Sequence, residues 1–456
     1  MSKPDLFDAF PQVSSKAWKQ KIQFDLKGLD YNESLVWESP EGIKVKPFYH
    51  SEDTRGNAVP PFPRKGKWNI GQHIFVADAI EANKKALDIL QRGAESLWFT
   101  VPSQEVQIDL LLKGIDASTT KIHLDFPFLS LEYFEQLNAI TDKLPSSVNV
   151  HLDPVGHLAR TGNWCHSMEK DFEMLGGLLS AHFQSHSLSI DVSLYQNAGA
   201  TMVQQLAYAM AHANEYLHRS ELISDQPYIF KVSVGSNYFF EIAKLRALRW
   251  LWNTLASEYG IASQCHIIAF PSKRNKTLYD YNMNMLRTTM ECMGAIIGGA
   301  DTICNLPYDA MYHKANEFGE RIARNQLLIL KHESYFDKVS NAADGAYYIE
   351  ALTQQMAEKA LALFKTLEKG GGFLKQLKAH TLQKKIKENA QKEQERFNIQ
   401  EEVLVGTNKY PNVQDKMKQD LELDPFLKRA VRKTLLEPIL EKRLAEVMEQ
   451  KRIQDE

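Results

Sequence analysis

Short apolar runs alternate with longer amphipathic stretches between about residues 66 and 370, and this alternation constrains the fold more than any other feature. Seven runs have the length and the β-branched or aromatic content of buried strands: 96–101, 121–126, 147–152, 188–194, 229–234, 265–270 and 301–306. A weaker run, "YYIE" at 347–350, is a candidate for an eighth strand. The stretches between the runs carry apolar residues at helical spacing.

A repeated strand-then-helix order predicts a parallel sheet covered by helices, and seven or eight such units indicate a TIM (β/α)8 barrel. A doubly wound open sheet is the alternative. The regular spacing and the absence of a Gly-rich dinucleotide loop disfavour it.

Two segments flank the predicted barrel. Residues 1–65 are expected to form an extended arm for subunit contact, because Pro60, Pro61 and Pro63 favour an extended backbone and cannot donate to a sheet. The barrel is expected over 66–370. Residues 371–456 are expected to form a helical extension, interrupted at Pro425 and Pro438.

Composition excludes several classes of partner. The formal net charge is −3, which does not point to nucleic acid or to an anionic membrane. The apolar runs are too short to cross a bilayer, and no secretory signal is expected from the N-terminal residues. The four cysteines are Cys165, Cys265, Cys292 and Cys304, and they form no C-x-x-C pair. We therefore expect reduced thiols and a cytoplasmic protein.

The common catalytic and metal-binding motifs are missing. The sequence contains no P-loop, no H-E-x-x-H and no G-x-S-x-G. The best metal candidates are the Cys165–His166 pair and the pair formed by His182 and His186, which would share a face of a helix. Neither pair has an evident third ligand, so no metal site is expected.

A TIM barrel carries its chemistry at the carboxyl ends of its strands. The residues that end the expected strands are mostly apolar or proline. Only Asp153 and Tyr195 could transfer a proton, and these two do not form an acid/base pair. We favour the interpretation that Asp153 caps a turn and that Tyr195 packs under a loop.

Eight segments in a fixed order carry a family resemblance. They are "EGIKVKPFY" (41–49), "KWNIGQ" (67–72), "EANKKALDILQRGAESL" (81–97), "QNAGA" (196–200), "LRTTMECMGAIIGGADTICNLPYDA" (286–310), "RIARNQLLIL" (321–330), "ADGAYYIEALTQQMAEKA" (343–360) and "VLVGTNKY" (403–410). Over about residues 18–450 the chain resembles the adenosylcobalamin-dependent acyl-CoA mutases, and the methylmalonyl-CoA mutase family in particular. The resemblance implies a TIM barrel with an N-terminal arm that embraces a second subunit.

The departures from the family pattern concern the substrate pocket. His73 stands where active members have a Tyr, and Gly71 where they have an Arg. Leu194 stands where they have a substrate-contacting His, and Phe270 where they have a substrate-binding Gln. No catalytic residue is therefore expected in this chain. The positions expected to form a vestigial pocket are His73, Leu194, Tyr195, Gln196 and Phe270.

The missing cobalamin-binding motif and the expected barrel interior also indicate a non-catalytic chain. The family holds cobalamin through a His in an Asp-x-His-x-x-Gly motif on a C-terminal domain, and none of the 14 histidines here follows an Asp by two residues. About half of the large strand residues should face inward and plug the barrel; these residues are Trp98, Phe99, Ile122, Leu124, Phe126, Phe230, Ile268 and Phe270.

The resemblance thus implies the small, non-catalytic subunit of a heterodimer that interconverts methylmalonyl-CoA and succinyl-CoA. The large subunit would bind the acyl-CoA and adenosylcobalamin, and this chain would bind no cofactor. One alternative is a catalytic chain whose cobalamin domain is a separate polypeptide. Another is a TIM-barrel enzyme that has drifted to a different reaction through Asp153 or Tyr195.

Overall fold

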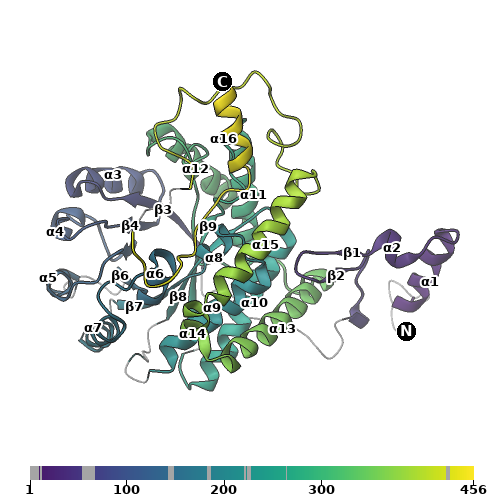
Figure 1. Cartoon of the computed structure of the whole chain (residues 1–456), viewed down its shortest axis with the longest axis horizontal. Helices are drawn as coiled ribbons and strands as arrows, with labels where there is room; N and C mark the ends of the chain where they lie inside the picture. The colour runs from purple at the N-terminus through teal and green to yellow at the C-terminus, as the bar shows by residue number, and fades with distance from the viewer. Residues whose placement is uncertain are drawn as a thin grey trace, which may run out of the picture.

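The computed structural model describes residue 10 and residues 13–53, 67–141, 148–181, 186–219, 222, 227–262, 264–427 and 432–456. Its centre is a closed barrel of eight parallel strands in the order β10-β3-β4-β5-β6-β7-β8-β9 (Figure 1). The strands are β3 (Asn69–Phe75), β4 (Ser96–Thr100), β5 (Lys121–Asp125), β6 (Val148–Leu152), β7 (His186–Asp191), β8 (Tyr228–Val234), β9 (Cys265–Pro271) and β10 (Thr302–Cys304). The predicted TIM barrel is confirmed.

The strand set differs from the prediction at two places. "YYIE" is not a strand, because it opens α13 (Tyr347–Lys369), whose apolar residues continue at helical spacing for 23 residues. The strand that closes the barrel is β3, which the sequence pattern did not reveal because Gly71 and Gln72 interrupt its apolar run. Gly71 is required there, since a Cβ at this position would collide with the Cys304 Sγ atom of β10.

Helices cover the outside of the barrel (Figure 1). They are α3 (Ala79–Gln91), α4 (Ile108–Leu111), α5 (Leu131–Thr141), α6 (Pro154–Thr161), α7 (Met168–Ala181), α8 (Ser193–Asn197), α9 (Met202–Leu217), α10 (Tyr238–Glu258), α11 (Met283–Ile297) and α12 (Glu317–Leu328), which runs into a π-helical turn at Ile329–Glu333. The main core lies between these helices and the outward faces of the strands. A further layer begins with α13, which packs against α9 and α10. It continues with α14 (Gly372–Lys378), which also packs against α9, and with α15 (Thr381–Asn398), which packs against α14.

The N-terminal segment projects away from the barrel, as Figure 1 shows at its purple end. It contains α1 (Ser15–Asp25), α2 (Tyr31–Leu35) and a two-stranded sheet of β1 (Trp37–Glu38) and β2 (Lys44–Val45). Helix α1 has no buried residue. The Glu41 carboxylate joins the arm to the barrel, because it accepts hydrogen bonds from the backbone N–H groups of Met202 and Val203, both at 2.8 Å.

The C-terminal segment is less helical than its charge pattern suggested. After α15, the described residues between 399 and 445 form no helix, and only α16 (Glu446–Asp455) follows. Residues 435–444 instead cross the barrel mouth as an extended strap, which is hydrogen-bonded to Gly162, Ala159, Asn197 and Arg274. These bonds use backbone groups that a helix would have satisfied internally.

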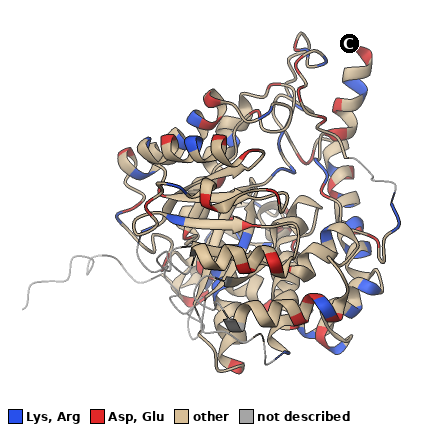
Figure 2. Ribbon diagram, turned by 90° about the vertical axis from the view of Figure 1, so that its left-hand side faces the viewer, with Lys and Arg blue, Asp and Glu red and all other residues tan. Residues whose placement is uncertain are grey.

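Surface charge is mixed. Figure 2 shows basic and acidic residues interspersed over the same helices. Among the described residues, none of the helices combines the length and the apolar content that a membrane crossing requires.

Candidate functional site

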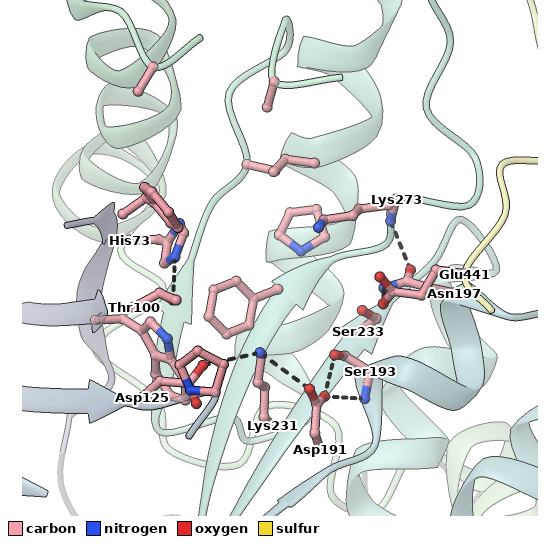
Figure 3. Close-up of a pocket in the computed structure, with 18 of the residues that line it drawn as sticks. His73, Thr100, Asp125, Asp191, Ser193, Asn197, Lys231, Ser233, Lys273 and Glu441 are labelled. Carbon is pink, nitrogen blue, oxygen red and sulfur yellow. Dashed lines mark hydrogen bonds and ion pairs between the residues drawn. The ribbon is translucent and has the colours of Figure 1, made fainter. Parts of the chain in front are cut away.

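A cavity of about 620 Å³ opens at the carboxyl ends of the barrel strands (Figure 3). Its wall combines strand ends with distant parts of the chain, because Leu423 and Glu441 from the C-terminal segment line it together with residues 305–316 after β10. This is the end at which TIM barrels carry their binding and catalytic groups.

A charged cluster lies at the base of the cavity. The Lys231 ammonium on β8 lies 3.4 Å from an Asp191 carboxylate oxygen on β7 and 3.9 Å from an Asp125 oxygen on β5. Arg160 on α6 contacts Asp191 at 2.6 Å and Glu441 at 3.4 Å. The strap is therefore tied to the barrel mouth through ion pairs.

Burial and neighbouring charge oppose each other in this cluster. Burial raises the pKa of Asp191, but Lys231, Arg160 and the Ser193 hydroxyl outweigh burial and hold that pKa well below its usual range. Burial alone would lower the pKa of Lys231, yet its two carboxylate neighbours raise it. Burial raises the pKa of Asp125, and the weaker contact with Lys231 does not compensate. Lys231 is thus held as an ammonium ion and cannot act as a base at neutral pH.

His73 on β3 lies on another side of the cavity. Its Nε2 atom is 3.0 Å from the Thr100 hydroxyl, and the cavity exposes the ring. Although the side chain is exposed to the cavity, enclosure by the surrounding protein, together with the charges of Lys231, Lys273 and Lys85, lowers the pKa of His73 to about 3. The imidazole is neutral, so it can offer one donor and one acceptor but no charge.

Below the cavity the barrel lumen is filled. Trp98, Ile229, Ile268 and Cys304 form a buried cluster against which Phe270 packs. Lys231 lies over the rings of Trp98 and Phe270, at 5.3 Å and 5.7 Å from their centres. Of the eight large strand residues, about half of which were predicted to face inward, Trp98, Ile268 and Phe270 do so. Phe99, Ile122, Leu124 and Phe230 lie in the core outside the strands, and Phe126 packs against that core.

Three histidines add to the lumen packing. The His123 and His151 rings share a hydrogen bond of 3.0 Å, the ring of His266 lies 5.7 Å from that of His123, and Trp98 packs on the first two. Burial is the main reason why the pKa values fall, to about 3 for His151 and about 4 for His266. These rings are neutral, and together with Trp98 they pack in the barrel interior, where Trp98 and His151 also line the cavity.

The structure brings only two of the five predicted pocket positions to the cavity, His73 and Phe270. Leu194 lies in the main core. Tyr195 and Gln196 are also buried, on the short helix α8, whose Ser193 and Asn197 line the cavity instead. The Gln196 side chain bonds to Glu241 at 3.2 Å and to Lys244 at 2.9 Å.

Asp153 and Tyr195 are connected, although the sequence treated them as separate groups. The Tyr195 hydroxyl lies 2.9 Å from His212 Nδ1, and His212 Nε2 lies 2.8 Å from the Asp153 carboxylate. Burial raises the pKa of Asp153, but hydrogen bonds from His212, Tyr216 and Gly156 hold it below its usual value. Asp153 was expected to cap a turn, and it caps the N-terminus of helix α6. The chain of contacts runs from Asp153, which lines the cavity, to the fully buried Tyr195.

The described residues of the two metal candidates do not form a site. His166 bonds to Asp171 at 3.1 Å, and His186 begins β7 instead of continuing a helix. His182 lies outside the described residues. Within the described part of the chain, no group of three or more His, Cys, Asp or Glu side chains could hold a metal ion.

Sequence reasoning missed Asp125, Asp191 and Lys231, which are the charged groups at the base of the cavity. Each is a single charged residue inside an apolar run, in "KIHLDF", "LSIDVSL" and "IFKVSV". That pattern was a usable signal, because a charge within a buried strand of a closed barrel must face the lumen.

The comparisons with known proteins agree with this geometry. Residues 133–453 match the family model described as "Methylmalonyl-CoA mutase". The chain is 34% identical over 451 residues to a protein named "Methylmalonyl-CoA mutase small subunit" from Porphyromonas gingivalis, with 90% of this chain and 72% of the relative covered. It is 27% identical over 445 residues to the protein of the same name from Streptomyces virginiae, with coverages of 88% and 71%.

A protein named "Methylmalonyl-CoA mutase" from Rhizobium meliloti is 29% identical over 482 residues, with coverages of 92% and 67%. Among solved structures, a dipeptide epimerase from Methylococcus capsulatus matches with a TM-score of 0.30 at 11% identity, over 56% of this chain and 63% of that chain, and this likeness carries no argument. The family match and the small-subunit relatives carry the conclusion: the chain belongs to the methylmalonyl-CoA mutase family, and within it to the group of small subunits.

Proposed function

We propose that this chain is the structural small subunit of a heterodimeric methylmalonyl-CoA mutase, and that the large subunit converts methylmalonyl-CoA to succinyl-CoA. The filled lumen is the observation that carries this proposal. An acyl-CoA has to pass its long pantetheine arm into the barrel to bring the acyl group to the site. Trp98, Phe270 and the buried histidines occupy that path.

The polar groups of the cavity also favour a chain without chemistry of its own. Catalysis of proton transfer needs a group whose pKa lies near the working pH. Lys231 and Asp191 neutralise each other, and His73 titrates far below neutrality. An arginine at Gly71, as in active relatives, would collide with β10.

The arm supplies the contact with the partner in this proposal. Trp18, Phe24 and Leu29 are more than half exposed, although such side chains are normally buried. Several large apolar residues on one projecting segment are typical of a surface that a partner covers. Obligate interfaces are large and apolar, so the isolated chain is expected to have low solubility.

Adenosylcobalamin is assigned to the large subunit. The donor set of this chain does not fit the cofactor, because none of its 14 histidines follows an Asp by two residues. The four cysteines are free thiols, which fits the cytoplasm as the compartment of the complex.

The test is co-expression of the full chain with the large mutase subunit of the same genome. We expect the two chains to co-purify with mutase activity, and this chain alone to have none. Replacing Trp18 and Phe24 by Ser should weaken association, whereas the same change at Tyr410, which is exposed outside the arm, should not. Failure of the two wild-type chains to associate would overturn the proposal.

One outcome would favour the alternative of a catalytic chain with a separate cobalamin polypeptide. In that case this chain would bind a methylmalonyl-CoA analogue stoichiometrically, and activity would appear when only a cobalamin-binding domain is added.

A further inference from the structure

Asp125 and Lys273 face the cavity with few charged partners among the described residues, and Lys314 on the cavity wall is a further cation of this kind. The Lys273 ammonium, two residues after the end of β9, has no direct hydrogen bond or ion pair among the described residues, although its charge helps to lower the pKa of Glu441. The Asp125 carboxylate has no hydrogen bond there, and its nearest cation is Lys231 at 3.9 Å. Solvent reaches both side chains, since Lys273 is exposed and the Asp125 side chain is 32% exposed, so each is accessible to a ligand group of the opposite charge.

The two groups lie on opposite sides of the barrel mouth. Strand β5, which ends at Asp125, and strand β9, which precedes Lys273, are separated by three strands in either direction around the closed barrel. Figure 3 shows Asp125 and Lys273 on opposite sides of the cavity, with Lys231 at its base between them. A ligand that contacts both must lie across the mouth.

Most of the remaining charge around the cavity is already neutralised. Arg160 and Lys231 contact Asp191, and Arg160 also contacts Glu441. Glu320 is paired with Lys85 at 2.5 Å. The cavity therefore has a cationic end at Lys273 and an anionic end at Asp125, and the neutral rings of Trp98 and Phe270 lie beneath.

From this arrangement we infer that the cavity binds a small carboxylic acid that carries an amino or hydroxyl group at its other end. The ligand carboxylate contacts Lys273, and its amino or hydroxyl group donates to Asp125. The filled lumen limits the ligand to the cavity of about 620 Å³ and excludes the thioester of a long carrier. This inference goes beyond the subunit role, because such a ligand would bind to the small subunit alone.

The test is isothermal titration calorimetry on the full chain with glycine, β-alanine, 4-aminobutyrate and 6-aminohexanoate, followed by the matching hydroxy acids. We expect saturable binding, strongest for the length that spans the cavity. The comparison of amino and hydroxy acids identifies the group at the Asp125 end. Butyrate, which lacks that group, should bind at least about tenfold more weakly, which is the loss of one charge-assisted hydrogen bond.

Variants locate the binding to this cavity. Lys273→Met and Asp125→Asn should each weaken binding of the best ligand by at least about tenfold. Lys121→Gln is the matched control, because Lys121 is exposed at the opposite end of strand β5 from Asp125. Circular dichroism should show that all three variants are folded.

Three results would overturn the inference. These are the absence of saturable binding for every member of both series, equal binding by the two cavity variants and the Lys121→Gln control, and competition by propionyl-CoA for the same site. None depends on association with the large subunit, so the result is independent of the test of the proposed function.

Discussion

The buried histidines of the lumen should make stability fall steeply in mild acid. His151 is the clearest case, because it is 4% exposed and its pKa in the folded chain is about 3, against an ordinary value near 6.5. The unfolded chain therefore binds a proton at this residue below pH 6.5, and the folded chain does not until about pH 3. The stabilisation is complete above pH 6.5 and is lost as the pH falls.

The size of the effect follows from proton linkage. Between pH 6 and pH 4, each such histidine contributes a slope of about 1.4 kcal/mol per pH unit to the free energy of unfolding. Lowering the pH from 7 to 5 reduces the free energy of unfolding by about 2 kcal/mol through His151 alone. Its neighbours His123 and His266, both with lowered pKa values, add further slope of the same sign.

The decisive variant is His151→Gln, whose amide can replace the hydrogen bond of Nε2 to His123. Urea unfolding followed by tryptophan fluorescence at half-unit steps from pH 5 to pH 7 should give a slope lower than wild type by about 1.4 kcal/mol per pH unit over the acidic half of this range. His332→Gln, at an exposed site, should leave the slope unchanged. If the free energy of unfolding has the same pH dependence in wild type and His151→Gln, the reasoning is refuted. That result would mean that His151 titrates equally in the folded and unfolded states.

Three further substitutions test the packing. Trp98→Ala should cost about 3–5 kcal/mol in urea unfolding, because it removes the ring that packs on His123, His151 and Phe270, and a loss below about 1 kcal/mol would contradict a filled lumen. Leu194→His should lower stability by about 2–4 kcal/mol in the same assay without creating mutase activity, because the imidazole would be unpaired in the apolar core; unchanged stability would show that Leu194 is not buried there. Glu41→Ala should lower the free energy of unfolding by about 1–2 kcal/mol and speed proteolysis of the arm. Glu38→Ala, at an exposed position, should do neither. Equal resistance of the two variants to proteolysis would argue against Glu41 as the residue that holds the arm on the barrel.

Leu194 illustrates how much of the candidate site could be predicted from the sequence. The position was identified by its place in a family motif, and its apolar character led to the prediction that it takes no part in proton transfer. The motif could not show that α8 begins at Ser193 and turns Leu194 into the core while Ser193 and Asn197 reach the cavity. The direction of a side chain on a five-residue helix depends on where that helix starts, and propensity does not fix this.

The alternation of apolar runs and amphipathic helices determined the barrel by itself, because each run has to bury both faces and each helix only one. Tertiary structure alone decided the closing strand β3, the strap across the mouth and the charged cluster of Asp125, Asp191 and Lys231. These features depend on contacts between residues far apart in the chain, and such contacts leave no periodic pattern in any one segment.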